Sequence, residues 1–121
     1  MISVGVDLVE IPRIRETIER WDSRFLRRVF SPKEIEFCES RRNKYQSFAV
    51  RFAAKEAILK AIGTGMYEGV RWKDMEILDD EKSIPRVYLK GHVKKLVGSR
   101  KVILSLSHTK DSALAFVILS S

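Results

Sequence analysis

Two acidic residues stand where a carboxylate could do chemistry, and the first of them is Glu56. It lies in the predicted helix 46–62, with Phe52 and Leu59 about one turn away and Lys60 four residues later. A carboxylate among apolar neighbours must be paired or bound to a cation, because burying a bare charge is costly. The simple alternative is a Glu56–Lys60 pair on the helix surface. That pair would explain Lys60 but not the apolar surroundings.

Asp7 is the second acidic candidate, near the end of the first predicted strand. Apolar residues of this strand alternate with small or polar ones: Ile2, Val4, Val6 and Leu8 against Ser3, Gly5 and Asp7. This period of two predicts a half-buried strand, and we expect the small residues to leave room beside Asp7. One carboxylate from a strand and one from a helix can hold Mg²⁺, which takes few protein oxygens. The alternative for Asp7 alone is an acid bonded to its own turn.

A third candidate, His108, lies at the end of the predicted strand 102–107. It follows Ser105 and Ser107 and precedes Thr109, so on a basic protein it could donate to a phosphate. A lone histidine at a strand end is more often structural, and both interpretations stay open. One cysteine and two distant histidines give no zinc spacing. The glycines at 63 and 65 follow a helix, which is the wrong side for a dinucleotide-binding turn.

Composition narrows the class of partner. The chain has 121 residues, with 23 Lys and Arg against 16 Asp and Glu, a net charge of +7. Such a protein attracts nucleic acid, phosphorylated small molecules or an acidic protein surface. The lone Cys38 cannot form an internal disulfide, which favours a reducing, cytoplasmic location. Apolar runs are too short for a membrane span, so we expect no membrane insertion.

Hydrophobic periodicity predicts a single α+β domain over 1–121, with a mainly antiparallel sheet of three or four strands packed by three helices. The predicted strands are 2–8, 102–107 and 113–119, with 75–78 and 86–89 as short β candidates. Three main helices are predicted: the first covers 13–29, the second starts at the capping box Ser31–Glu34 and ends near 41–44, and the third covers 46–62 and ends at Gly63. A small helix over 92–97 is a further candidate.

Arginines are concentrated in the predicted helix 13–29. If this segment is one helix, five of them fall on a common face: Arg13, Arg20, Arg24, Arg27 and Arg28. That face is either a solvated flank or a docking surface for an acidic partner. A cap at Asp22 and Ser23 would break the helix and misalign the arginines.

Four segments of the chain, in this order and spacing, resemble one family. The chain resembles the holo-[acyl-carrier-protein] synthases, the short bacterial class of 4′-phosphopantetheinyl transferases. Its motifs are similar to those of the family, and the departures are small. Val6 stands where the family usually has isoleucine. The matching segments are Val4–Ile11, Phe30–Glu34, Arg51–Ala57 with Lys60 to Gly65, and Ser105–Thr109 followed by Ala113, Ala115 and Val117.

The resemblance implies transfer of the 4′-phosphopantetheine arm of coenzyme A to a serine of apo acyl carrier protein. Adenosine 3′,5′-bisphosphate would be released, and fatty acid biosynthesis would be supported. By this resemblance, Asp7 and Glu56 are ligands of Mg²⁺, with Mn²⁺ as an alternative. Glu56 would also help to deprotonate the serine, and Lys60 would stabilise the leaving phosphate.

The resemblance also implies where the substrates bind. Coenzyme A would contact Arg51, His108, Thr109, Lys44 and Gly63. His108 would bind the 3′-phosphate, and Lys44 is a further candidate for the same phosphate. The acidic carrier protein would dock on Arg13, Arg20, Arg24 and Arg28, with Trp21 and Phe25 as core or apolar contacts. Members of this class form homotrimers with active sites between subunits, and we expect the same here.

Two other classes of function compete with this one. A small basic nucleic-acid-binding domain explains the net charge but neither Asp7 nor the acid on the apolar helix. A noncatalytic module that binds carrier proteins would keep the arginines without needing Asp7, Glu56 and Lys60 together. We therefore favour the enzyme and expect no nucleic-acid partner.

Overall fold

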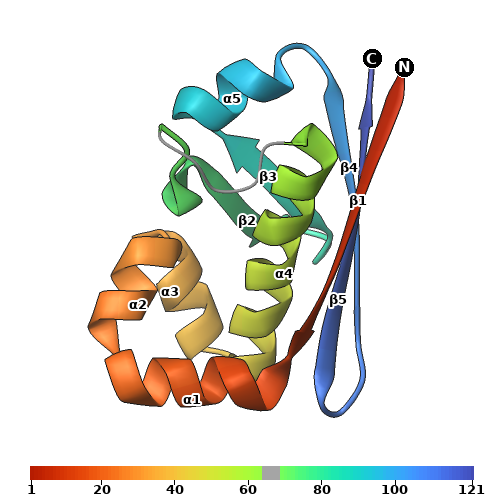
Figure 1. Ribbon diagram of the computed structural model, residues 1–121. Coiled ribbons are helices and arrows are strands. Elements are labelled where there is room, and N and C mark those ends of the chain that lie inside the picture. Colours follow the sequence, from red (N-terminus) through yellow and green to blue (C-terminus); the bar gives the residue numbers. More distant parts are fainter. Residues whose placement is uncertain (64–68) are drawn as a thin grey trace.

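The computed structural model describes residues 1–63 and 69–121 and combines helices with antiparallel strands (Figure 1). Thr64 and Gly65 of the predicted motif lie outside the described residues. In chain order the elements are β1 (Ile2–Glu10), α1 (Ile11–Trp21), α2 (Ser23–Val29), α3 (Pro32–Glu39), α4 (Lys44–Ile62), the 3₁₀ turn η1 (Trp72–Asp74), β2 (Met75–Asp79), β3 (Pro85–Leu89), α5 (Gly91–Val97), β4 (Lys101–His108) and β5 (Ser112–Ser120). The predicted α+β class is confirmed.

The strands form two sheets instead of one. β1, β5 and β4 make a three-stranded antiparallel sheet in that order, and β2 pairs with β3 in a separate hairpin. Ile2 lies opposite Ser120 and Glu10 opposite Ser112, so β1 and β5 pair along their whole length. Helix α4 runs along the three-stranded sheet. Helices α1, α2 and α3 lie on the side of α4 that faces away from the sheet (Figure 1).

Helix α4 lies directly against β1 because small residues line the contact. A Cβ built on Gly5 would come 2.1 Å from the carbonyl oxygen of Ala57 and 2.7 Å from the amide nitrogen of Ala61. The small side of β1 therefore packs on the helix, and its aliphatic side faces outward, with Ile2 67% and Leu8 65% exposed. Helix α4 fills the space beside Gly5, whereas room remains next to Asp7, as described below.

The arginine-rich segment is two helices, as the alternative with a break at Asp22 predicted. Asp22 has φ of 45° and separates α1 from α2. Five arginines thus lie on two helices, and the continuous stripe of a single helix does not form. Two other boundaries follow the sequence: Ser31 and Glu34 form the predicted capping box, and Gly63 ends α4 with φ of 90°. The predicted start of α4 was wrong by two residues, because the helix begins at Lys44.

The Gly5 contact predicts a large effect of a single methyl group. Gly5→Ala should destabilise the protein by about 3 kcal/mol, because backbone atoms of α4 cannot move aside as a side chain can. Gly63→Ala is the matched control: its left-handed backbone costs about 1 kcal/mol, but no atom lies within 4 Å of the new methyl group. Denaturant unfolding of both variants measures the difference. Equal losses of stability would contradict the close packing of β1 on α4.

Candidate active site

Strand β1 and helix α4 bring Asp7, Glu56 and Lys60 together. Lys60 Nζ lies 3.0 Å from Asp7 Oδ1 and donates a 3.0 Å hydrogen bond to the Val6 carbonyl oxygen. The Asp7 side chain is mostly buried, at 14% exposed, whereas Lys60 is half exposed. Within the described part of the chain, Lys60 thus forms its ion pair with Asp7 across to the strand. The simple alternative of a Glu56–Lys60 pair is not the one that forms.

Glu56 is held in an environment that disfavours its charge. Partial burial raises the pKa of Glu56 above its ordinary value, and the negative charge of Asp7 raises it further. Lys60 opposes these effects and lowers the same pKa, but does not cancel them. Two carboxylates that repel each other in a partly buried place form a site that a cation would stabilise.

Magnesium fits this set of oxygen donors. Asp7 and Glu56 supply carboxylate oxygens alone, and the described residues contain no cluster of three or more His, Cys, Asp or Glu that could hold a metal. Mg²⁺ is commonly bound by one or two carboxylates and keeps its other positions for water and phosphate oxygens. A zinc site would need more protein ligands, with nitrogen or sulfur among them.

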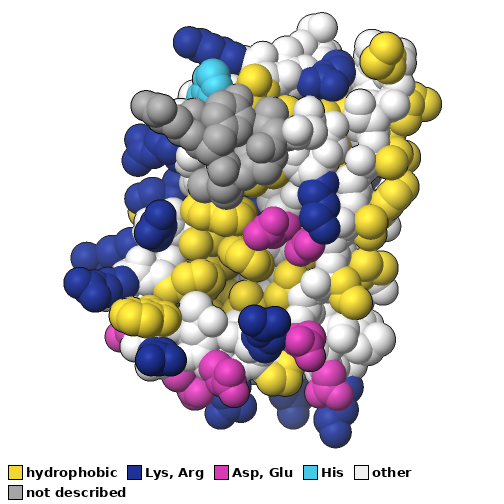
Figure 2. All heavy atoms as spheres, viewed as in Figure 1, with side chains coloured by type: hydrophobic (Ala, Val, Ile, Leu, Met, Phe, Trp, Pro, Cys, Tyr) yellow, Lys and Arg dark blue, Asp and Glu magenta, His cyan; other side chains and the backbone are white. Residues whose placement is uncertain are grey.

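A cavity of about 360 Å³ opens beside the two carboxylates. Its walls include Ile14 of α1, Phe25 of α2 and Phe52 of α4, and Arg13 lies at its edge. The rings of Phe25 and Phe52 are 6.1 Å apart. Figure 2 shows this face of the molecule: acidic side chains stand next to a basic one above a hollow lined by hydrophobic side chains. The site therefore joins a charged end to an apolar wall.

A second cavity, of about 630 Å³, is lined by residues that the first does not share, including Arg51 and His108. His108 Nδ1 lies 3.1 Å from Gln46 Nε2. Arg42 lies at the same cavity. Because cationic and hydrogen-bonding groups converge here, this cavity can receive an anionic ligand.

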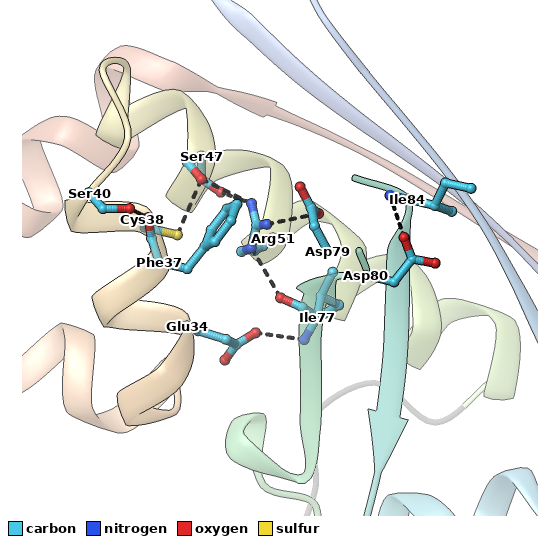
Figure 3. Close-up of polar contacts among 10 residues, drawn as sticks. All are labelled: Glu34, Phe37, Cys38, Ser40, Ser47, Arg51, Ile77, Asp79, Asp80 and Ile84. Carbon is cyan, nitrogen blue, oxygen red and sulfur yellow. Dashed lines mark hydrogen bonds and ion pairs between the residues drawn. The ribbon is translucent and has the colours of Figure 1, made fainter. Parts of the chain in front are cut away.

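Arg51 is buried within a set of polar contacts (Figure 3). Its guanidinium donates to the carbonyl oxygens of Ile77 and Ser47, to Ser47 Oγ and to Asp79 Oδ1, at 3.0 to 3.3 Å. It also lies over the ring of Phe37, 4.4 Å from the centroid. These contacts hold the guanidinium rigidly in the wall of the second cavity.

The two cavities lie on different sides of α4. Arg51 precedes Glu56 by five residues, which places the two side chains about 140° apart around a helix of 3.6 residues per turn. Lys60 is nine residues after Arg51 and lies about 180° from it. Within one chain, the structure thus separates Arg51 from Glu56 and Lys60, which the family resemblance assigned to the same coenzyme A molecule.

Three other predicted residues do not line the second cavity. Thr109 Oγ1 accepts a hydrogen bond from the Ser112 amide and holds the β4–β5 turn. Lys44 contacts Glu39 at 3.5 Å and lies over the ring of Tyr45, in a neighbouring cavity. Gly63 is the C-cap of α4.

The predicted docking residues are exposed on α1 and α2. Arg13 and Arg20 lie on α1, Arg24 and Arg28 on α2. The Arg20 guanidinium stacks on Trp21, which is itself 48% exposed. Phe25 is half-buried and packs on Phe30 and Phe52, so it serves both the core and the cavity wall.

A charged pair that the sequence patterns did not predict lies beside this site. Lys55 and Glu34 form an ion pair of 2.7 Å, and both side chains are 0% exposed. The sequence predicts a capping role for Glu34 and no partner on α4. The available signal was the position of Lys55 on α4, between Ala54 and Glu56 and one turn before Ile58 and Leu59.

The chain belongs to the 4′-phosphopantetheinyl transferase superfamily, whose family model matches residues 3–117. It is 49% identical to the holo-[acyl-carrier-protein] synthase of Chlamydia caviae over 115 residues, which covers 95% of this chain and 93% of that one. The structure is similar to that of the Neisseria meningitidis holo-[acyl-carrier-protein] synthase, with 31% identity, full coverage of both chains and a TM-score of 0.88. The Helicobacter pylori enzyme in complex with coenzyme A is 32% identical, covers 97% of this chain and 99% of its own, and gives a TM-score of 0.85.

The proximity of the two acids predicts coupled pKa values in the metal-free protein. Asp7→Asn should lower the pKa of Glu56, because it removes a repelling charge and frees Lys60 from its partner. Lys60→Met should raise the same pKa. Carboxyl-carbon NMR titration of Glu56 measures both shifts. A Glu56 pKa that neither substitution moves would show that the three groups do not interact.

Proposed function

We propose that this protein transfers the 4′-phosphopantetheine arm of coenzyme A to a serine of apo acyl carrier protein and releases adenosine 3′,5′-bisphosphate. The observation that carries the proposal is the grouping of Asp7, Glu56 and Lys60 beside an apolar cavity. Relatives that are holo-[acyl-carrier-protein] synthases over nearly the whole chain support the same reaction.

In this reaction the serine oxygen forms a bond to the phosphorus that carries the pantetheine arm. The bond from that phosphorus to the oxygen bridging the two phosphates breaks, and its electron pair leaves with adenosine 3′,5′-bisphosphate. Lys60 stabilises the charge that builds on the leaving phosphate. Glu56 helps to remove the serine proton, the role that the family resemblance implies for it.

Asp7 and Glu56 are the residues that would hold Mg²⁺, with Mn²⁺ as an alternative. The cation would supply charge neutralisation on the pyrophosphate of coenzyme A. Asp7 stays ordered for this role through its contact with Lys60.

We assign the nucleotide end of coenzyme A to the second cavity. His108 is the donor for the 3′-phosphate, and Arg51 is a rigid part of the wall. Thr109, Lys44 and Gly63 stay predictions of the family resemblance, since their contacts serve the turn, Glu39 and the end of α4.

The carrier protein is proposed to dock on α1 and α2. Arg13, Arg20, Arg24 and Arg28 offer positive charge to an acidic partner, and exposed Trp21 offers apolar area. These helices form one wall of the cavity beside Glu56, so a docked carrier would present its serine there.

We further propose a homotrimer with active sites between subunits. Exposed aliphatic and aromatic side chains on the outer face of the three-stranded sheet support it, because an apolar patch of this kind marks an interface. Its members are Ile2, Val4, Val6, Leu8, Ile103, Leu114 and Phe116. Glu56 and Arg51 lie on different sides of α4, so a second copy would be needed to bring the two cavities to one coenzyme A molecule.

We place this reaction in the cytoplasm, in support of fatty acid biosynthesis, and assign it to the chain as one domain. The buried free thiol of Cys38 supports a reducing compartment. Packing of α4 against the sheet, against α1 and against α3 supports one domain. As a separate finding, no helix among the described residues has the length and apolarity needed to cross a membrane.

The metal-ligand roles predict a separation of chemistry from carrier binding. Asp7→Asn and Glu56→Gln should each lower kcat at least 100-fold, because each removes a charged oxygen ligand. The affinity for apo carrier protein should change less than threefold, since neither residue lies on the arginine surface. Transfer is measured by intact mass of the carrier, and binding by calorimetry. Equal loss of both would contradict these roles.

The trimer predicts that a charge on the sheet face breaks assembly. Val6 lies opposite Phe116 in the β1–β5 pairing, so Val6→Glu would place a carboxylate within the patch. Sedimentation should show trimers for the parent and monomers for Val6→Glu, with transfer lost at the same concentration. Ile84→Glu, at an exposed site outside the sheet, is the matched control and should stay trimeric. A monomeric parent that transfers at full rate would overturn the assignment.

A further inference from the structure

A fully buried ion pair lies at the meeting point of four elements. Lys55 of α4 and Glu34 of α3 are both 0% exposed, and their charged atoms are 2.7 Å apart. Burial lowers the pKa of Lys55 from its ordinary value, and the charge and hydrogen bond of Glu34 oppose that effect. A buried pair of this kind contributes little net stability compared with apolar residues, so its presence calls for another reason.

The contacts of the pair fix backbone groups of neighbouring elements. Lys55 Nζ donates a 2.6 Å hydrogen bond to the carbonyl oxygen of Val29, the last residue of α2. Glu34 accepts from the backbone amides of Ser31 and Ile77, both at 2.9 Å. Figure 3 shows the Glu34 carboxylate directed at the Ile77 amide of β2. Lys55 thus holds the end of α2, and Glu34 holds the start of its own helix and the backbone of β2.

These contacts connect the arginine surface to the acidic site. Helix α2, held at its end by Lys55, carries Arg24 and Arg28, and its Phe25 forms part of the cavity wall. Lys55 immediately precedes Glu56, so the two side chains leave the same turn of α4. The Lys55–Val29 hydrogen bond therefore helps to fix the position of the proposed docking helix α2 relative to Glu56.

Aromatic packing continues the same connection. Lys55 Nζ lies 5.0 Å from the centroid of Phe30, and Phe30 packs on Phe25 at 6.1 Å. Phe25 in turn contacts Phe52 in the cavity wall. A shift of the α2 end would move the rings that line the space beside Glu56.

We propose that Lys55 and Glu34 are positioning residues, which hold helix α2 in the place where the carrier protein binds beside Glu56. This inference rests on the proposed function and on the docking role of α2. It concerns the carrier side of the site because Lys55 bonds the end of α2, whose Phe25 lines the cavity beside Glu56. Glu34 reaches the second cavity indirectly, through the Ile77 backbone that also accepts a hydrogen bond from Arg51.

Single and double substitutions separate positioning from stability. Lys55→Met leaves Glu34 buried without its counter-ion, so it should lower Tm strongly. Glu34→Gln with Lys55→Met removes both charges and should recover much of that Tm. Val29 stays without its donor in the double variant. Glu34→Gln alone keeps the side-chain volume and gives a milder variant that is expected to fold.

The experiment measures Tm, the Kd for apo carrier protein, the Kd for coenzyme A and the KM of each substrate, with every variant well below its own Tm. We expect the Lys55→Met and double variants to weaken carrier Kd and KM about tenfold and to leave those for coenzyme A within twofold. Leu119→Ala, in the sheet core away from α2, is the control: it should lower Tm without changing carrier binding. In Glu34→Gln the same carrier-side selectivity should appear with a smaller amplitude.

Two results would overturn the inference. In the first, the carrier affinity of the double variant returns to the parent value together with Tm. The pair would then serve the stability of the fold alone. Equal weakening of both substrates, or an unchanged carrier Kd in Lys55→Met and in Glu34→Gln, would remove the link to α2. A parent that binds carrier protein without transferring the arm would count against the proposed function, while the Kd comparison would still test the positioning role.

Discussion

The close contact between Gly5 and the backbone of α4 is the constraint on which the site depends. With no side chain between them, strand and helix approach so closely that Lys60 reaches both the Val6 carbonyl and the Asp7 carboxylate. The same approach brings the charge of Asp7 near enough to raise the pKa of Glu56. A larger residue at position 5 would separate the two acids and with them the place where a cation could bind. The contact between Gly5 and α4 also turns the aliphatic side of β1 outward, and so creates the surface proposed for assembly.

Helix α4 is the element that organises the rest of the molecule. It carries Glu56 and Lys60 on one side, Arg51 on another and Lys55 toward the α2–α3 helices, so each neighbouring layer meets a different charged residue. These charges are satisfied in different ways: Arg51 by carbonyls and Asp79, Lys55 by Glu34 and Val29. Because of this division, one chain presents two half-sites. In the proposed assembly, two copies of the chain are needed to complete one active site.

Much of the fold could be predicted from the sequence, and the failures have physical causes. The capping box at Ser31, the end of α4 at Gly63 and the α+β class follow from local patterns and were confirmed. Alternation alone could not predict which side of β1 faces inward. The aliphatic side would ordinarily be placed in the core, and its exposure is explained only if another subunit covers it. The number of sheets was not predicted because tertiary packing decides whether the local β2–β3 hairpin joins the three-stranded sheet.

The candidate site was predictable in its residues but not in its contacts. Asp7, Glu56 and Lys60 were chosen correctly as neighbours, yet the ion pair joins Lys60 to the strand and not to Glu56. Lys55 escaped notice because a lysine beside a glutamate on a helix is ordinarily solvated. Only the structure shows that Glu34, far away in sequence, supplies its counter-ion.

The most direct test of the proposed reaction is the intact mass of apo acyl carrier protein after incubation with this protein, coenzyme A and Mg²⁺. The proposed reaction predicts a mass gain of one phosphopantetheine arm, and no gain when a chelator is added. A carrier whose mass stays unchanged, with both proteins folded and the carrier bound, would contradict the account and leave a binding module in place of an enzyme.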